Sequence, residues 1–257
     1  MSLNNNINHS VVRWPYGRIP LEDFLKSLNE LGINAIELVE PEDYPLLKKY
    51  NIHCSMCQGA EISFVKGWNN TKNHETLIKN YLEIIPLVAQ AGYTNLICFS
   101  GSRGEIDDAI GLQNCVKGLE QIIPVAEQYG VILHMELLNS KTAPHVDYMC
   151  DHTEWGVQLC QKVDSDNFKL LYDIFHMQLM EGNIISTIRN FHDYIGHYHT
   201  GGVPGRLNID DAQELNYPAI MKAILKTGFT GYVAQEFLPT GKDKIGALEK
   251  AVTICDI

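Results

Sequence analysis

Four side chains that can bind a metal ion lie near the ends of four successive apolar segments in the second half of the chain. They are Glu136, Asp173, His199 and Glu236. Three carboxylates and one imidazole form a mostly hard ligand set, which suits Mn²⁺, Mg²⁺ or Co²⁺ and also admits Zn²⁺. If the four segments are neighbouring strands of one sheet, their ends converge and the side chains can surround a single ion.

Each of these residues alone has a simpler explanation. A carboxylate at the end of a strand often caps the next helix or pairs with a nearby lysine. However, apolar runs such as 131–133 and 232–234 do not place charge in a sheet without a partner. Because the pattern repeats at four successive strand ends, we predict one functional site rather than four unrelated carboxylates and imidazoles.

Eight short apolar or β-branched runs alternate with segments of helical periodicity, which is typical of a parallel sheet covered by helices. The runs span residues 9–12, 33–39, 52–57, 95–99, 131–137, 169–173, 195–199 and 231–237. Eight parallel strands close a barrel, and 257 residues is a common length for one such barrel. We therefore predict an α/β fold in which residues 1–257 form a single (β/α)₈ TIM barrel.

Three helices are predicted from apolar residues that repeat every three or four positions over 21–31, 77–88 and 116–126. Each stripe is followed by a glycine that would end the helix: Gly32, Gly92 and Gly130. The longest irregular stretches, 59–73 and 200–216, follow the third and seventh strands. They are candidate lids over an active site, or plain surface connections.

The seven cysteines are an odd number without the dense spacing of a secreted disulfide scaffold, so reduced thiols are expected. Cys54 and Cys57 form a C-x-x-C motif, but no second pair follows at zinc-site spacing. We predict two small buried residues that point to opposite faces of a strand.

The composition excludes several partners. With 31 acidic and 20 basic residues, the net charge of −11 disfavours binding to nucleic acid. No stretch reaches the roughly 18 apolar residues of a membrane helix, and the first nine residues do not resemble a targeting signal. We expect a cytoplasmic protein that acts on a small molecule, with a homo-oligomer as an open alternative.

Four segments of the second half also match a known pattern: 171–182 (LYDIFHMQLMEG), 196–206 (GHYHTGGVPGR), 214–218 (ELNYP) and 228–237 (GFTGYVAQEF). They resemble the hydroxypyruvate isomerase family, a branch of the xylose isomerase-like TIM barrels. The opening segment 10–14 (SVVRW), with Gly17 and residues 19–24, is similar as well, so the resemblance runs nearly end to end.

The resemblance implies an isomerase of carbohydrate metabolism that interconverts aldose-like and ketose-like compounds. Glu136, Asp173, His199 and Glu236 match its metal-binding positions. Glu136 and Glu236 would also serve as the catalytic acid/base pair, while His176 and Arg206 would contact the substrate. These roles suit proton transfer beside a carbonyl, which needs a base and a group that stabilises the enediolate charge.

Further residues are candidates for substrate binding. Lys141 and His145 follow the fifth strand, and Trp14 and Trp68 could line the pocket. A histidine inside a helix, a solvated arginine or lysine and a packed tryptophan are the ordinary alternatives for these residues. His134 and His197 lie two residues before Glu136 and His199, so we expect them one layer deeper in the barrel.

One departure leaves the substrate open. The hydroxypyruvate isomerases often carry glutamine at the position of His199, whereas the ketose 3-epimerases carry histidine. The segment 139–142 (NSKT), in turn, lacks the pattern of the epimerase branch. A ketose 3-epimerase and a non-catalytic sugar-binding barrel therefore remain alternatives. An apurinic endonuclease on the same barrel is disfavoured by the net charge of −11.

Overall fold

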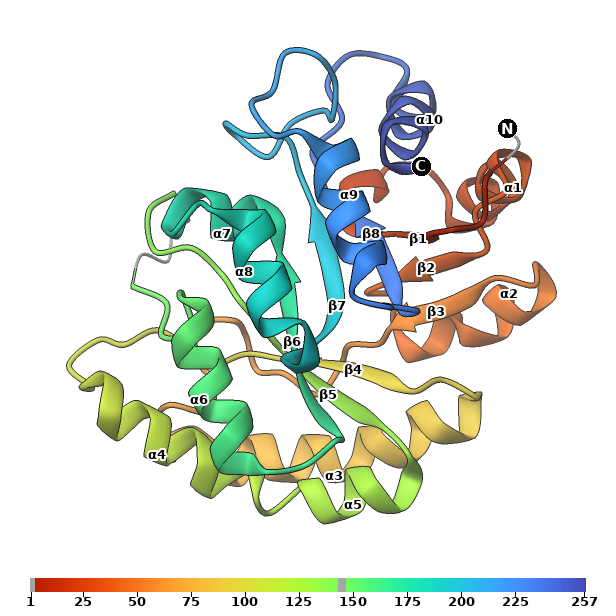
Figure 1. The fold of residues 1–257 in the computed structure, drawn as a ribbon. Helices are drawn as coiled ribbons and strands as arrows, with labels where there is room; N and C mark the ends of the chain where they lie inside the picture. The colour runs from red at the N-terminus through yellow and green to blue at the C-terminus, as the bar shows by residue number, and fades with distance from the viewer. Residues whose placement is uncertain (1–2, 143–146) are drawn as a thin grey trace.

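The computed structural model describes residues 3–142 and 147–257, and in these ranges eight parallel strands form the centre of the molecule (Figure 1). The strands are β1 (Asn8–Val11), β2 (Ala35–Glu37), β3 (His53–Met56), β4 (Asn95–Cys98), β5 (Ile132–Glu136), β6 (Phe168–Asp173), β7 (Ile195–Thr200) and β8 (Tyr232–Gln235). All eight predicted strands are present, and their bounds differ from the predicted ones by at most two residues.

The strands close into a ring in the order of the sequence. Hydrogen bonds join β1, β8, β7, β6, β5 and β4 into one sheet and β2 with β3 into another. Two isolated parallel bridges, Val12 with Glu37 and Cys57 with Leu96, connect the two sheets at both seams. The predicted (β/α)₈ barrel is confirmed.

Helices surround the strands (Figure 1). The α-helices are α1 (Leu21–Leu31), α2 (Tyr44–Lys49), α3 (His74–Ala91), α4 (Asp108–Leu119), α5 (Ile123–Tyr129), α6 (Thr153–Val163), α7 (Ile174–Met180), α8 (Ile184–Phe191), α9 (Tyr217–Lys226) and α10 (Lys244–Cys255). Short 3₁₀ helices occur at η1 (Trp14–Tyr16), η2 (Pro41–Asp43), η3 (Thr71–Asn73) and η4 (His192–Tyr194).

Two of the three predicted helices are confirmed with their glycine stops, since Gly32 and Gly92 end α1 and α3 in the left-handed conformation. The prediction of one helix over 116–126 is wrong. That stripe is divided between α4 and α5, because Pro124 lacks a backbone N–H and lies in the first turn of a new helix rather than continuing the old one.

Alternation along the strands separates an apolar outer layer from an inner layer that holds polar groups and a small apolar cluster. In β5, Leu133 and Met135 belong to the large hydrophobic core, whereas His134 and Glu136 have the opposite orientation. A separate apolar cluster of Met56, Ile97 and Leu171 comes from three different strands. The helices are therefore held to the sheet by apolar contacts, and polar groups can occupy the barrel without breaking that layer.

The loop after β3 lies against the loop after β4. Trp68 N donates to Phe99 O at 3.2 Å, and Asn69 N donates to Ser100 O at 2.8 Å. Gly67 is required at this contact, because a Cβ there would come within 2.3 Å of backbone atoms of residues 99–101.

All seven cysteines lie in the described ranges, and all are buried and free. Cys54 and Cys57 are buried as predicted, but the expectation that they point to opposite faces is wrong. Their sulfur atoms are 3.6 Å apart. The alternation of a strand does not extend to Cys57, because β3 ends at Met56.

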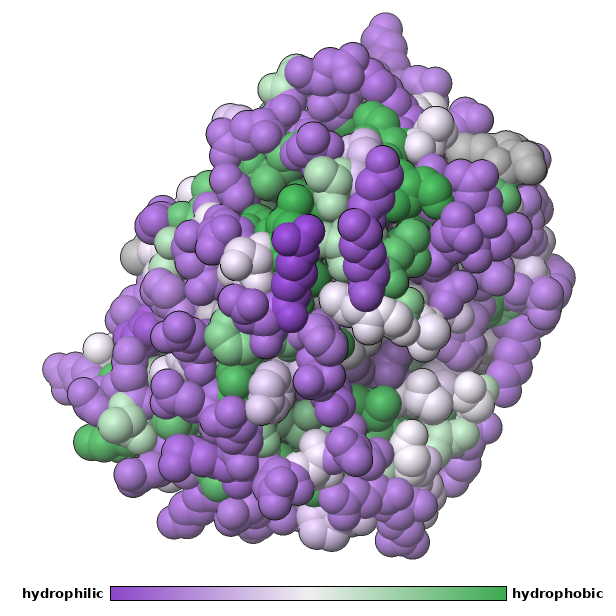
Figure 2. All heavy atoms as spheres, in the orientation of Figure 1, coloured by the Kyte–Doolittle hydropathy of each residue, from purple (hydrophilic) through white to green (hydrophobic). Residues whose placement is uncertain are grey.

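The two ends of the described chain lie together, since Asn4 N donates to Asp256 Oδ2 at 2.7 Å. On the face drawn in Figure 2, hydrophilic side chains predominate and apolar ones lie between them in small groups. Among the described residues, no helix combines the length and apolar character that a membrane span requires.

Candidate metal and active site

The four predicted metal ligands meet at the carboxyl end of the sheet. Glu136 and Asp173 are the last residues of β5 and β6, His199 lies in β7, and Glu236 directly follows β8. Each offers one ligand atom, and these atoms all lie within 4.8 Å of one another. Parallel strands produce this convergence because adjacent strand ends point in the same direction.

His199 is the centre of this cluster. Its Nδ1 lies 3.2 Å from Glu136 Oε1, 2.5 Å from Glu236 Oε2 and 3.9 Å from Asp173 Oδ2. All four side chains are buried. Three carboxylates at such short range require positive charge between them, because like charges repel strongly where water is excluded.

The pKa shifts of the clustered residues show the same need for positive charge. Burial, together with the charges of Glu236 and Asp173, raises the pKa of Glu136 to about 7. Burial would also raise the pKa of Glu236, but Arg206 and His199 hold it well below its usual range. The pKa of His199 is raised well above its usual value, because Glu236 and Glu37 outweigh the effect of burial. The cluster therefore favours a cation.

Arg206 supplies one positive charge from the loop after β7. Its Nη2 contacts carboxylate oxygens of both Asp173 and Glu236, and its Nε donates to the backbone carbonyl of Glu236 at 2.9 Å. The guanidinium also lies over the ring of Phe175, 5.0 Å from its centre. Arg206 is thus part of the cluster and not a solvated surface residue.

His176 lies at the edge of the cluster, in the first turn of α7. The backbone N–H of Asn139 donates to His176 Nδ1 at 3.1 Å, and Nδ2 of the same residue lies 2.6 Å away. On the other side of the ring, His176 Nε2 is 2.7 Å from Arg206 Nη1. Burial lowers the pKa of His176 to about 4, so the imidazole stays neutral.

Three other predicted substrate contacts differ in placement. Trp14 is 46% exposed, and its indole Nε1 donates to Glu236 Oε1 at 2.8 Å, which places it at the site. Lys141 Nζ instead donates to the carbonyl of Leu179 in α7 at 2.6 Å. His145 lies outside the described residues.

Trp68 is placed in the core and not among the groups around the cluster. Its ring packs against Tyr81 and His74, with centroid separations of 5.3 and 5.8 Å, and a Cβ on Gly118 would touch it. These neighbours belong to α3 and α4. We therefore correct the expectation that Trp68 lines the pocket, since its apolar ring is fully used in packing the helix layer.

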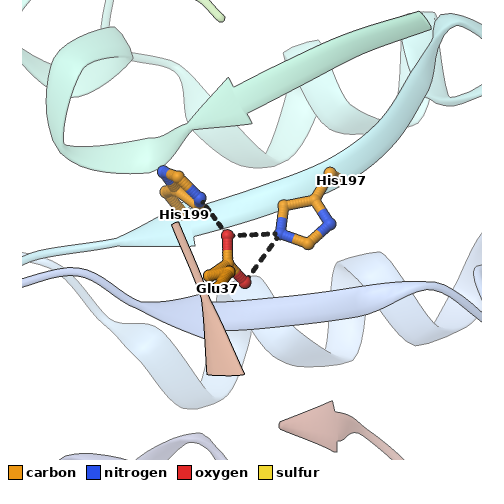
Figure 3. A group of neighbouring side chains, drawn as sticks. All are labelled: Glu37, His197 and His199. Carbon is orange, nitrogen blue, oxygen red and sulfur yellow. Dashed lines mark hydrogen bonds and ion pairs between the residues drawn. The ribbon is translucent and has the colours of Figure 1, made fainter. Parts of the chain in front are cut away.

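Glu37 is a site residue that the sequence analysis missed. It ends β2, is fully buried, and lies between His197 and His199 (Figure 3). The signal was available, because Glu37 is a lone carboxylate in the apolar run 33–39. His197 and His134 lie below the cluster as predicted: His197 contacts Glu37, and His134 Nε2 is 3.1 Å from Asn95 Oδ1.

Comparison with known families supports the same interpretation. The sequence profile described as "Xylose isomerase-like TIM barrel" matches residues 13–250. The chain belongs to this family. A member of the xylose isomerase-like TIM barrels has the fold found here, and the resemblance noted in the sequence is confirmed.

Two relatives cover most of the chain. A human protein provisionally named a hydroxypyruvate isomerase is 33% identical over 236 residues, which cover 90% of this chain and 79% of the relative. The 2-oxo-tetronate isomerase of Pectobacterium atrosepticum is 29% identical over 243 residues, which cover 89% of this chain and 90% of the relative. Both relatives are named as isomerases.

Two solved structures show the same barrel. An AP endonuclease of family 2 from Brucella melitensis has a TM-score of 0.84 at 19% identity, covering 93% of this chain and 96% of that one. The IOLI protein with a bound zinc atom has a TM-score of 0.77 at 16% identity, covering 97% and 98%. At these identities the likeness shows the fold alone.

Proposed function

We propose that the chain is a divalent-metal-dependent isomerase that moves a proton between adjacent carbons of a small hydroxy-carbonyl compound, such as hydroxypyruvate or a 2-oxo-tetronate. One observation carries the proposal: the ligand atoms of Glu136, Asp173, His199 and Glu236 converge within 4.8 Å at the mouth of the barrel. The names of the two relatives that span most of the chain support the reaction class.

The donor set fits a divalent ion. Three carboxylates and one imidazole nitrogen supply four ligands from four adjacent strands, which suits Mn²⁺, Mg²⁺ or Co²⁺ and admits Zn²⁺. When bound, such an ion would stabilise the negative charge that develops on the substrate oxygens during proton transfer. Glu136, Asp173, His199 and Glu236 would hold it.

Glu136 and Glu236 are the proposed acid/base pair. They project from β5 and β8, with His199 from β7 between them, at 3.2 and 2.5 Å from their nearest oxygens. A substrate above the cluster would therefore have a carboxylate on each side. One carboxylate removes the proton from the hydroxyl-bearing carbon, and a proton is returned to the neighbouring carbonyl carbon. The hydroxyl proton passes to the former carbonyl oxygen, so that the hydroxyl and carbonyl groups change places. Trp14 positions Glu236 through its indole N–H.

His176 and Arg206 are the proposed contacts to substrate oxygen. Arg206 Nη1 lies 2.7 Å from His176 Nε2, at hydrogen-bond distance, and a guanidinium can only donate. An oxygen of the substrate, from a hydroxyl or carboxylate group, would accept from the Arg206 guanidinium beside the His176 ring. We do not assign Lys141 to the substrate, because its ammonium group already binds Leu179 O.

Turnover of Glu136→Gln and Glu236→Gln variants tests the assignment. Each variant should keep the barrel by circular dichroism and lose turnover by about 10²-fold or more. Glu83→Gln, on the exposed face of α3, is the matched control and should retain turnover. Full turnover by either active-site variant would reject the acid/base assignment.

A ketose 3-epimerase is the second candidate, favoured by a histidine at position 199 where the isomerases often carry glutamine. The two reactions share the metal and the base chemistry, but a 3-epimerase returns the proton to the opposite face of the carbon that lost it, whereas the isomerase returns it to the neighbouring carbon. A panel of hydroxypyruvate, a 2-oxo-tetronate and several ketohexoses, assayed with Mn²⁺ in D₂O, separates them. The substrate that incorporates deuterium at the reacting carbon with the highest kcat/KM identifies the reaction.

A further inference from the structure

Glu37 contacts the proposed metal site from the opposite side of the barrel. The four proposed ligands come from β5 to β8, whereas Glu37 ends β2. The pairing of β2 with β3 skips one residue between Ile36 and Glu37, and Leu38 has a left-handed backbone with φ of 55°. A left-handed backbone is unfavourable for leucine. Such local strain is typical of places where the surrounding structure holds a functional side chain, here Glu37, in a particular orientation.

The carboxylate of Glu37 is completely paired inside the barrel (Figure 3). Its Oε2 lies 2.7 Å from His199 Nε2 and 3.1 Å from His197 Nε2. Its Oε1 accepts a hydrogen bond from Ser55 Oγ at 2.9 Å. A buried carboxylate is tolerated only when donors surround it in this way, and these donors fix its position.

The two nitrogens of His199 therefore face different groups. Nε2 faces Glu37, which can only accept a hydrogen bond when ionised, so the proton belongs on Nε2. Nδ1 faces the oxygens of Glu136, Asp173 and Glu236, so without an ion it also carries a proton, and a bound divalent ion would replace that proton and accept the Nδ1 lone pair. A histidine ligand needs this division, since one nitrogen binds the ion and the other is fixed by an acceptor.

We propose that Glu37 is a positioning residue that holds His199 in the rotamer and tautomer required for metal binding through Nδ1. This inference rests on the proposed metal-dependent function and extends it to a fifth strand. His197 lies on the same inward face of β7 and donates to the same carboxylate, so it restrains Glu37 and not the ion.

A second metal ion between Glu37, His197 and His199 is the competing explanation, because their ligand atoms also lie within 4.8 Å of one another. The charge balance argues against it. The proposed site holds three mutually repelling carboxylates, whereas this group holds a single carboxylate. Glu37 is already satisfied by His199, His197 and Ser55 and needs no ion.

Nuclear magnetic resonance on the unsubstituted protein tests the tautomer directly. The chain, labelled with ¹⁵N in its histidines, is loaded with Zn²⁺, and the His199 signals are assigned by their loss in His199→Gln. We expect a proton on Nε2 and none on Nδ1. A proton on Nδ1, or its absence from Nε2, would overturn the positioning role.

Calorimetric titration with Mn²⁺ tests the energetic consequence. Glu37→Gln should weaken Mn²⁺ binding by about 10- to 100-fold, as is usual when the partner of a ligating histidine is removed. Ser10→Ala is the matched control, because Ser10 is buried in the same layer and contacts Ser55 but not His199. Its affinity should stay within about twofold of the parent.

The outcomes separate the two proposals. If the unsubstituted chain takes up no Mn²⁺, the metal-dependent function is wrong and the role of Glu37 falls with it. If the parent binds one ion and Glu37→Gln binds equally well, only the positioning role is overturned. Equal weakening by Ser10→Ala would also overturn it, since general loosening of the polar layer would then explain the effect. Loss of a second Mn²⁺ equivalent in Glu37→Gln would establish the competing metal site.

Discussion

Replacement of Arg206 by methionine should destabilise the barrel in the absence of a divalent ion. The guanidinium contacts carboxylate oxygens of Asp173 and Glu236, and its side chain is only 11% exposed. Methionine retains much of the apolar contact with Phe175 but removes the charge and its hydrogen bonds. The variant therefore leaves buried carboxylates with less compensating positive charge.

The magnitude follows from this burial. Breaking a buried ion pair by removing one partner lowers the free energy of unfolding by about 3–5 kcal/mol. For a domain of this size, each 1 kcal/mol shifts the melting temperature by about 2–4 °C. Arg206→Met should therefore melt about 6–20 °C below the parent protein in EDTA.

Added Mn²⁺ should reduce the difference in melting temperature between Arg206→Met and the parent, because a divalent ion at the carboxylates replaces the lost positive charge. An ion at a hundred times its dissociation constant stabilises the folded state by about 2.7 kcal/mol. In the variant the ion also relieves the extra repulsion, so its stabilisation should exceed that of the parent. Differential scanning calorimetry with EDTA and with saturating Mn²⁺ measures all four melting temperatures.

Arg18→Met, on an exposed arginine, is the control and should change the stability by less than about 0.5 kcal/mol. Melting of Arg206→Met within about 2 °C of the parent in EDTA would refute the charge-balance reasoning. The same conclusion would follow if the gap were equal with and without Mn²⁺, because the guanidinium would then act only by packing.

Three further outcomes are expected. Gly67→Ala should lower the free energy of unfolding by about 1–3 kcal/mol in urea denaturation, because its Cβ meets rigid backbone at 2.3 Å, while Gly17→Ala, whose nearest contact is 3.4 Å, should change it much less. Burial lowers the pKa of His9 despite the nearby Asp256, so the unfolded chain binds more protons than the folded protein as the pH falls below 6.5. The free energy of unfolding should therefore decrease below that pH by up to about 1.4 kcal/mol per pH unit. A His9→Gln variant whose pH dependence equals that of the parent would contradict this expectation. Trp14→Phe keeps an aromatic ring but removes the hydrogen bond to Glu236. In the isomerase assay kcat/KM should fall about tenfold, with little change in melting temperature. Unchanged kcat/KM would exclude a role for the indole N–H.

The fold could be predicted because its signals are local. Each strand is an apolar run, and single glycines such as Gly32 and Gly92 mark the ends of helices. The split between α4 and α5 does not show in the apolar pattern, because the stripe continues across Pro124. A periodic pattern reports which face is apolar, and it does not report whether the helix is continuous.

The site could be predicted only in part. The ends of parallel strands converge, so the positions of Glu136, Asp173 and Glu236 at strand ends were enough to predict that these side chains meet. The contacts of Lys141 and Trp68 depend instead on loop conformation, which single residues do not encode. Glu37 was missed for another reason: its proximity to His199 follows from closure of the barrel, and they are separated by 162 residues.

The buried charges around His199 lower the stability of the fold, and this is the strongest physical reason to assign the cluster a function. Four buried carboxylates, Glu37, Glu136, Asp173 and Glu236, surround one imidazole, with Arg206 nearby. Well-packed apolar residues of similar volume would often stabilise such a position more than a network of buried charges does. The outer layer of the same strands is apolar, so the sequence can supply such residues and does so wherever packing alone is required. Departure from that rule at one end of the barrel, on five strands at once, is expected where charge is needed to bind an ion and move a proton.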